Sequence, residues 1–274
     1  MITYRELHTD HDWELVERLQ REVWMLEDLA IVPSRMVQVI AHCGGHVQGA
    51  FVGSEMVAFT LALVARQRGE VRLWSHMSGV LPAYRGKGIG FRIKSLQRLW
   101  ALAQGYRTIA WTFDPLQRVN ANFNLRRLGA VGVAYHVNFY GEMSDELNRG
   151  MPSDRLEVVW DLNSARVVDH ADGDPQPVLV ETRDDHFIVT TGADNLPVTR
   201  IPTKFTNVCY FVEAPYDLER VRAQGAEAVA AWREAHRQAI GGALAAGYSV
   251  VDFVNSVDRC WHVLYRTSEQ AASS

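Results

Sequence analysis

A short stretch rich in glycine and cationic residues carries the clearest chemistry in this sequence. It covers residues 80–90 and reads VLPAYRGKGIG. An apolar, strand-like run enters it, and an amphipathic helix leaves it. Glycines let backbone amides approach a ligand closely, and a helix start offers unpaired amides and the positive end of the helix dipole. The stretch is therefore expected to hold an anion, such as the phosphates of a cofactor.

Two common nucleotide-binding motifs do not fit this stretch. A P-loop needs G-x-x-x-x-G-K-[ST], whereas Lys87 stands between two glycines with no Ser or Thr after it. A Rossmann fingerprint needs G-x-G-x-x-G, and here the third glycine comes one residue early. What fits is R-x-x-G-x-G, formed by Arg85, Gly88 and Gly90. This resembles the pyrophosphate-binding motif of the GNAT acyltransferase superfamily, whose members bind acyl-CoA.

The resemblance implies an acyl-CoA co-substrate, either acetyl-CoA or succinyl-CoA, and no metal. The loop would bind the pyrophosphate. The family splays two central strands apart, here expected at 70–81 and 107–113, so unpaired backbone groups near Val80 would bind the pantetheine arm and the acyl carbonyl. Asparagines on the helix that follows could bind the pantetheine amides, or simply cap the backbone locally. The expected cofactor-binding residues are Val80, Leu81, Arg85, Gly86, Lys87, Gly88, Ile89, Gly90, Asn120 and Asn122.

His76 is the expected catalytic base. Acyl transfer from a thioester to an amine needs a base with a pKa near the working pH, and His is the side chain that starts there. His76 lies on the strand that leads into the loop, and regular alternation would place Trp74, His76, Ser78 and Val80 on one face. Several GNAT enzymes take a proton acceptor from this strand. Glu70 is a second candidate base, and a structural His hydrogen-bonded within the sheet is the alternative interpretation.

The usual general acid of the family is missing. In many GNAT enzymes a Tyr on the helix after the next strand protonates the leaving sulfur, but alignment on Gly129 places Leu125 at that position. Tyr135 or Tyr140, expected on the following strand, could serve instead. Because they are five residues apart, at most one of them faces the site. Alternatively the thiolate leaves without an acid, since a thiol has a pKa near 8.5.

The segment between the first two predicted helices supplies the expected acceptor-binding residues. By resemblance, this connection borders the acceptor pocket of GNAT folds. Trp24, Glu27 and Asp28 could therefore recognise an amine. The alternative is ordinary packing by the Trp beside a solvated acidic turn.

The elements that must position these residues follow the order β-α-α-β-β-β-α-β-α-β-β over residues 1–163, which is the element order of the GNAT fold. The expected fold class is therefore α/β with a mixed, splayed central sheet. Expected strands are 2–7, 46–52, 56–65, 70–81, 107–113, 131–141 and 156–162, and expected helices include 10–24, 85–104 and 116–128.

The rest of the chain is expected to form a second α/β half at 164–267, followed by a disordered tail at 268–274. Residues 164–204 look like a connection with short strands, and 205–213 and 248–254 like strands around an Ala-rich helix. Residues 99–113 and 242–254 share a pattern of helix, Gly-aromatic and strand. The second half could therefore be a degenerate copy of the first that lacks the R-x-x-G-x-G loop, although helix-Gly-strand is common in α/β proteins.

Composition restricts the remaining function classes. The chain has 274 residues, a net charge of −4 and 47% hydrophobic residues, with no basic tract, so nucleic acid is not an expected partner. Three widely spaced cysteines argue against zinc and fit a reducing cytoplasm. The sequence shows no signal peptide and no run long enough to span a bilayer, so a membrane is not an expected partner either. An oligomer is compatible with these observations.

The leading hypothesis is an N-acyltransferase that moves an acetyl, succinyl or other short acyl group from acyl-CoA to a small amine. The chain is most similar to a long bacterial GNAT group with an extra C-terminal α/β half. Some members of this group are thought to act beside N-acylamino-acid racemases, which implies an amino-acid acceptor. The alternatives are a protein N-acyltransferase and a non-catalytic acyl-CoA sensor.

Overall fold

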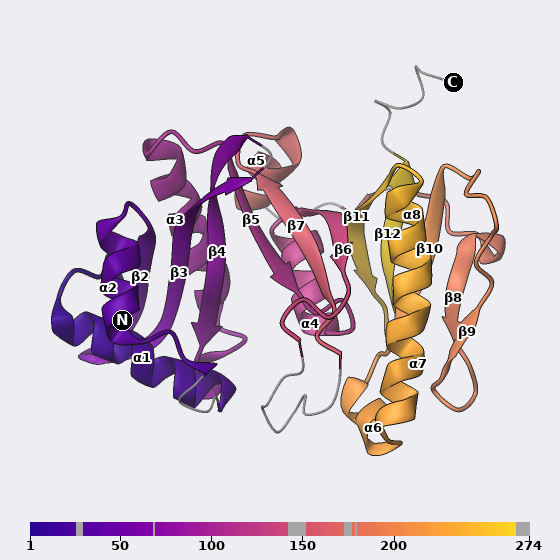
Figure 1. Cartoon of the computed structure of the whole chain (residues 1–274), viewed down its shortest axis with the longest axis horizontal. Coiled ribbons are helices and arrows are strands. Elements are labelled where there is room, and N and C mark those ends of the chain that lie inside the picture. Colours follow the sequence, from indigo (N-terminus) through magenta and orange to yellow (C-terminus); the bar gives the residue numbers. More distant parts are fainter. Residues whose placement is uncertain (26–29, 68, 142–151, 173–176, 179, 267–274) are drawn as a thin grey trace. The chain divides into compact units, whose positions relative to one another are not determined.

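The computed structural model describes residues 1–25, 30–67, 69–141, 152–172, 177–178 and 180–266 (Figure 1). The chain divides into two compact units. Unit 1 comprises Met1–Trp111 with Asp161–Ser164, and unit 2 comprises Thr112–Trp160 with Ala165–Ser274. Both units combine helices with a β-sheet, so the predicted α/β class is confirmed. The expected domains, 1–163 and 164–267, stay a prediction. In the described ranges, no helix is long and apolar enough to cross a membrane.

The sheet of unit 1 is an antiparallel meander that ends in one parallel pairing. Its strands are β1 (Ile2–Glu6), β2 (His46–Val52), β3 (Glu55–Gln67), β4 (Glu70–Val80) and the start of β5 (Thr108–Phe113). β4 pairs with β5 at Leu73↔Ile109 and Trp74↔Ala110. Beyond Trp74, β3 is the strand that pairs with β4 among the described residues. This confirms the predicted splay of the two central strands.

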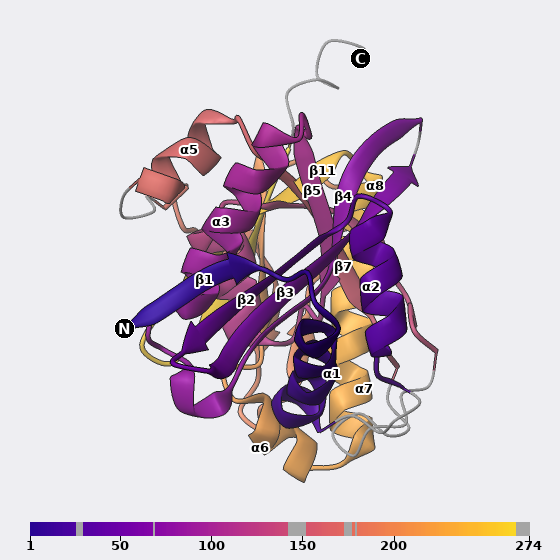
Figure 2. The same ribbon diagram turned by 90° about the vertical axis from the view of Figure 1, so that its left-hand side faces the viewer.

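Helices cover both faces of the unit 1 sheet. They are α1 (Asp10–Trp24), α2 (Ser34–His42) and α3 (Ile89–Ala103), all visible in Figure 2. Neighbouring residues on a strand point to opposite faces. Phe59 of β3 contacts Trp24 of α1, whereas Thr60 accepts a hydrogen bond from Gln97 of α3. α1 and α3 therefore pack on opposite faces.

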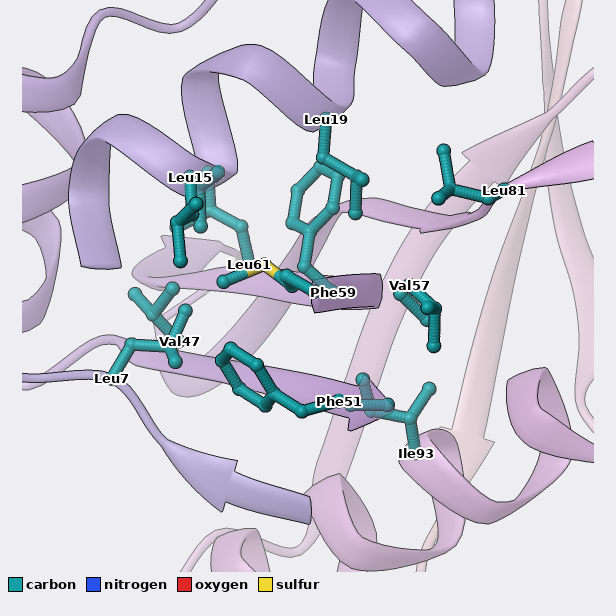
Figure 3. Close-up of a cluster of buried hydrophobic side chains, with 14 of the residues drawn as sticks. Leu7, Leu15, Leu19, Val47, Phe51, Val57, Phe59, Leu61, Leu81 and Ile93 are labelled. Carbon is teal, nitrogen blue, oxygen red and sulfur yellow. The ribbon is translucent and has the colours of Figure 1, made fainter. Parts of the chain in front are cut away.

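The core of unit 1 joins α1 to the meander. Figure 3 shows Leu15 and Leu19 of α1 beside Phe59 and Leu61 of β3, and all four are buried. α1 has the predicted bounds: Thr9 and Asp12 form a capping box at its first turn, and Met25, after its last residue, takes a left-handed φ of 52°. The cap stabilises the N-terminal end of α1, and core packing holds the rest of the helix as far as Trp24.

Unit 2 begins at Thr112, within β5, and contains the second series of paired strands. A hairpin of β6 (Val131–His136) and β7 (Arg155–Asp161) continues through β11 (Tyr248–Asn255), β12 (Cys260–Arg266), β10 (Cys209–Ala214), β8 (Phe187–Thr191) and β9 (Pro197–Thr199). β8 and β10 are parallel, and the other pairings are antiparallel. Its helices are α4 (Arg118–Ala121), extended by a π-helix at Asn122–Arg127, α5 (Ala165–Asp172), α6 (Leu218–Ala223), α7 (Ala226–His236) and α8 (Gly242–Ala245).

Several predicted bounds differ from the structure. The helix expected at 85–104 starts at Ile89, because Gly88 adopts φ 76° at its N-cap. The strand expected at 131–141 ends at His136, since Asn138 takes a left-handed φ of 51°. The strand expected at 205–213 starts at Cys209, and α5 was not predicted. A residue with positive φ interrupts a helix or strand. Such a residue can be predicted from the sequence where it is a glycine, but not where it is another residue type such as Asn138.

The strand pairing of the C-terminal segment differs from that of unit 1. β4 and β5, which flank α3, are direct parallel neighbours. β10 and β11, which flank α7, both pair antiparallel with β12 between them. This is a split β-α-β arrangement. The difference concerns only the strands around α3 and α7, so a degenerate copy of the first half stays a prediction.

Candidate functional site

His76 sits at a β-bulge in the middle of β4. The pairing with β3 runs through Leu61↔Met77 and then Ala62↔Ser75, so His76 is an extra residue without a partner opposite it. Bulges disrupt the local ladder, bend the strand and re-aim side chains, and they are frequent beside active sites. His76 therefore lies on irregular backbone, close to the position after which β4 no longer pairs with β5.

The bulge inverts the alternation of side chains along β4. Ser75 accepts a hydrogen bond from Lys94 of α3, so it faces the α3 side. Gly79 faces the other side, because a Cβ there would lie 2.9 Å from the ring of Trp24 on α1. Residues four apart on a regular strand share a face. The predicted uninterrupted alternation through His76 is therefore wrong.

The environment of His76 favours the neutral imidazole. The side chain is exposed, yet desolvation by surrounding protein atoms lowers its pKa below the ordinary value. These two observations fit a ring with one face open to solvent and the rest crowded by protein. No described residue forms a hydrogen bond with the ring. At neutral pH His76 is thus unprotonated and accessible, which suits a proton acceptor.

The loop after β4 exposes backbone donors. Gly86 and Gly88 adopt φ values of 75° and 76°, and a Cβ on either would meet nothing within 4 Å. Among the described residues, the amides of Gly86, Lys87 and Gly88 have no hydrogen-bond acceptor. Gly88 is also the N-cap of α3, whose first turn has no side-chain cap. The loop and helix start together form an open concavity of amides suited to an anion.

The two cations of the loop are held close to it. Arg85 Nε donates to the carbonyl of Val80 at 3.1 Å, and its terminal nitrogen donates to the carbonyl of Val23 at 3.3 Å. Lys87 Nζ donates to the carbonyl of Ala83 at 3.0 Å. Both side chains are exposed, so they add positive charge beside the amides.

The backbone groups expected to be unpaired at the end of β4 are used within unit 1. The carbonyl of Val80 accepts from Arg85, and the amide of Leu81 donates to the carbonyl of Val57 at 2.9 Å. These two atoms already have partners, and ligand binding by backbone near Val80 stays a prediction. Backbone available to a ligand lies instead nearer the bulge or in the loop.

Trp24 packs beside this strand. Its ring meets Phe59 edge-on with centroids 5.8 Å apart and lies over Gly79, three residues from His76. Trp24 thus has the packing role given above as the alternative interpretation, and its recognition of an acceptor stays a prediction. Glu27 and Asp28 lie outside the described residues.

The two candidate acids belong to unit 2. Tyr135 lies on β6 and donates a 3.0 Å hydrogen bond to Asp154. Desolvation and the charge of Asp154 raise its pKa far above the ordinary value. Tyr140 lies in a turn after β6, not on the predicted strand, and is 48% exposed, with Arg155 over its ring. Tyr140 is therefore the better placed of the two to exchange a proton with a ligand.

The asparagine-bearing helix of unit 2 differs in form from the prediction. Asn120 is exposed on α4, and Asn122 is half-buried at the start of the π-helix. Leu125, which stands at the position of the family Tyr, is fully buried. A π-turn is a frequent feature of functional sites, but the role of both asparagines stays a prediction.

Comparisons with solved structures found proteins of similar fold. The structure matches the ribosomal-protein-S18-alanine N-acetyltransferase of Escherichia coli over 60% of this chain and 96% of that one (14% identity, TM-score 0.49). It matches a GNAT-family acetyltransferase from Streptococcus pneumoniae over 58% and 98% (16% identity, TM-score 0.47). An N-acetyltransferase from Staphylococcus aureus matches over 60% and 99% (15% identity, TM-score 0.46). The chain is similar in structure to GNAT acetyltransferases. No family model matches the chain, and no curated protein matches its sequence.

Sequence reasoning missed a buried polar network on the α3 side of β4. Lys94, at 3% exposure, donates to Ser75 Oγ at 3.0 Å and to Gln97 Oε1 at 2.6 Å. Burial lowers the pKa of Lys94 to about 7. The signal that could have found it is a Lys and a Gln three residues apart within the apolar stripe of the helix at 89–103, since a buried stripe rarely contains Lys.

The described part of the chain thus combines an accessible neutral histidine with a loop of open amides on one strand-loop-helix unit. It contains no group of three His, Cys, Asp or Glu side chains that could hold a metal ion. The arrangement is suited to a phosphate-bearing ligand at the loop and to a proton acceptor at His76, ten residues before Gly86.

Proposed function

We propose that the protein is a GNAT N-acyltransferase that moves a short acyl group from acyl-CoA to a small primary amine. One observation carries this proposal. β4 displays His76 from its bulge and runs directly into a loop whose glycine amides are open. One continuous segment would therefore supply both the binding site for a phosphate-bearing co-substrate and the proton acceptor.

The loop and the start of α3 would bind the cofactor's pyrophosphate. Amides from Gly86 to Gly90 and the α3 dipole supply hydrogen-bond donors and positive potential, and Arg85 and Lys87 add charge. Val80, Leu81 and Ile89 shape the loop's ends. The resemblance adds Asn120 and Asn122 for the pantetheine arm. The absence of β5 as a partner beyond Trp74 leaves an edge of β4 along which that arm would lie.

The reaction would need only one group with a tuned pKa. The neutral imidazole of His76 takes a proton from the acceptor's ammonium, and the free amine attacks the thioester carbonyl. A C–N bond forms, the C–S bond breaks, and CoA leaves as its thiolate, while the extra proton on the attacking nitrogen passes to the thiolate or to solvent. Tyr140 could protonate the thiolate, although a thiol of pKa near 8.5 leaves adequately without help.

The acceptor would be a small molecule such as an amino acid, recognised beside Trp24, with acetyl-CoA or succinyl-CoA as donor. This finer assignment rests on the sequence resemblance. A protein acceptor and a non-catalytic acyl-CoA sensor are the competing outcomes.

Turnover assays test the proposal directly. Release of free CoA from acetyl-CoA and succinyl-CoA is measured with a panel of amino acids and peptides, beside calorimetric CoA binding. We expect amine-dependent CoA release and a loss of about 100-fold or more in kcat/KM for His76→Ala, the usual range for a general base.

His11→Ala is the matched control, because His11 is an exposed histidine of α1 outside the site. Its activity should equal that of the wild type. Tight CoA binding without turnover on any amine would support the sensor, and turnover on peptides alone would support a protein acceptor. Absence of CoA binding would refute the proposal altogether.

A further inference from the structure

The two residues that flank His76 in the bulge are both tied to α3. On one side, Ser75 Oγ accepts from Lys94 Nζ at 3.0 Å and donates to Gln97 Oε1 at 3.3 Å. On the other side, the carbonyl of Met77 accepts from Thr60 Oγ1 at 3.3 Å, and Thr60 accepts from Gln97 Nε2 at 3.0 Å. The chain of hydrogen bonds therefore begins at Lys94 and ends across the bulge.

In this series of hydrogen bonds, each named polar atom acts as a donor or an acceptor in a way that its chemistry allows. The side chains of Lys94, Gln97 and Ser75 are buried, and Thr60 has no exposed surface. Breaking one link leaves a buried donor or acceptor unpaired, which costs about 1–3 kcal/mol. A network of this kind fixes one local geometry rather than several.

Other groups pack around the ammonium of Lys94. Trp111 of β5 places its ring 4.2 Å from Nζ, and His46 of β2 lies close enough for the charge of Lys94 to lower its pKa further than burial alone does. The pKa of His46 falls to about 3, so it stays neutral and does not compete for the role of cation. Lys94 therefore touches β4, β5 and its own helix at one point.

A bulge is the least constrained part of a strand pair, because its extra residue has no ladder partner. Whatever fixes Ser75 and Met77 therefore also fixes the backbone of His76. We propose that Lys94 and Gln97 of α3, acting through Ser75 and Thr60, are positioning residues that hold the bulge in the geometry that aims His76 at its substrate. This inference rests on the proposed function for His76. It also links the helix that starts at the cofactor loop to the catalytic strand.

A pair of substitutions at Thr60 separates positioning from packing. Thr60→Val keeps the volume but removes the hydroxyl, whereas Thr60→Ser keeps the hydroxyl but removes a buried methyl. Both should lower stability modestly. We expect Thr60→Val to lose about 10- to 100-fold in kcat, with KM for acyl-CoA nearly unchanged, as for a small misplacement of a catalytic group. Thr60→Ser should recover most of that loss.

Lys94→Met extends the test to the other side of the bulge, and Ser95→Ala is its matched control. Ser95 neighbours Lys94 on α3, but its hydroxyl donates to Phe91 within the helix. NMR of labelled histidines, with His76 assigned by comparison with His76→Gln, gives a readout that needs no turnover. In Thr60→Val and Lys94→Met the His76 midpoint should rise toward 6.5, because a relaxed bulge solvates the ring.

Three outcomes are distinguishable. A shifted His76 midpoint together with a kcat loss that follows the hydroxyl of residue 60 establishes the positioning role. An unchanged midpoint in both variants overturns it, whether or not the protein turns over. A shifted midpoint in a protein without any acyl-transfer activity keeps the link between α3 and the bulge but refutes the proposed function.

Discussion

Arg233 of α7 pairs with Asp114, the residue that follows β5, through a two-point ion pair inside unit 2. The second contact, between Arg233 Nη2 and Asp114 Oδ2, measures 2.6 Å, and Arg233 is 3% exposed. Asp114 also accepts a hydrogen bond from the amide of Leu116 at 2.9 Å. A helix of the C-terminal segment is thus bound to the end of a strand that the GNAT resemblance assigns to the first half.

Removing one partner of this pair should destabilise the protein strongly. Asp114→Leu leaves the Arg233 guanidinium buried and uncompensated, so we expect a loss of about 3–5 kcal/mol in the free energy of unfolding. Urea unfolding measures it. The double variant Asp114→Leu with Arg233→Met should recover most of the loss. Equal losses for the single and double variants would show that the pair itself is not responsible.

The same pair should make unit 2 acid-sensitive. Burial alone would raise the pKa of Asp114, but the hydrogen bonds and charge of Arg233 outweigh it and hold the pKa below the ordinary value. The unfolded carboxyl therefore binds protons at a higher pH than the folded one. The stabilisation is present above about pH 4 and is lost as the pH falls further. Comparing urea midpoints at pH 6 and pH 3, with the double variant as reference, checks this.

Lys94 should give unit 1 a pH dependence of the same sign, but in a higher pH range. Burial lowers its folded pKa to about 7, against about 10.4 in an unfolded chain. Between these values the unfolded state binds more protons, so stability rises with pH and the penalty is complete below about pH 7. From pH 7 to pH 9 this group should add about 2 kcal/mol to the free energy of unfolding. Lys94→Met should lack that increment, and an identical pH slope in the variant would show that Lys94 is not desolvated.

A matched pair of glycines tests the cofactor loop. Gly88, at the start of α3, and Gly105, just after its end, have φ values of 76° and 82°, and a Cβ on either meets nothing within 4 Å. Gly88→Ala and Gly105→Ala should therefore cost similar stability, about 1 kcal/mol. Only Gly88→Ala should also weaken CoA binding, because its methyl group would project into the space beside the loop amides. Calorimetry with CoA compares them, and equal affinities would contradict the loop assignment.

Local sequence signals were enough for much of unit 1. The helical spacing of apolar residues predicted the bounds of α1, and the R-x-x-G-x-G spacing located the loop and its open glycines. These features depend on contacts within a few residues. The sequence therefore carries them without knowledge of the tertiary structure.

The bulge and the polar network are tertiary properties and could not be predicted. Nothing within residues 70–80 shows which residue of β4 lacks a partner, because the register is set jointly with β3. The alternation assumed for His76 failed for that reason. Lys94 and Gln97 were visible as polar interruptions of an apolar stripe, but their acceptors, Ser75 and Thr60, lie on other elements.

The source of the leaving-group proton can be tested at the two tyrosines of unit 2. The hydroxyl of Tyr135 donates to Asp154, which also pairs with Arg237, so its proton is held within a structural cluster. Tyr135→Phe should lower stability by about 1 kcal/mol through the lost hydrogen bond and leave kcat within about twofold. If Tyr140 is the acid, Tyr140→Phe should instead lower kcat without a comparable loss of stability, and most for donors with a poor thiol leaving group. If neither variant lowers kcat, the thiolate leaves unassisted, whereas a large kcat loss in Tyr135→Phe at unchanged stability would assign the acid to Tyr135.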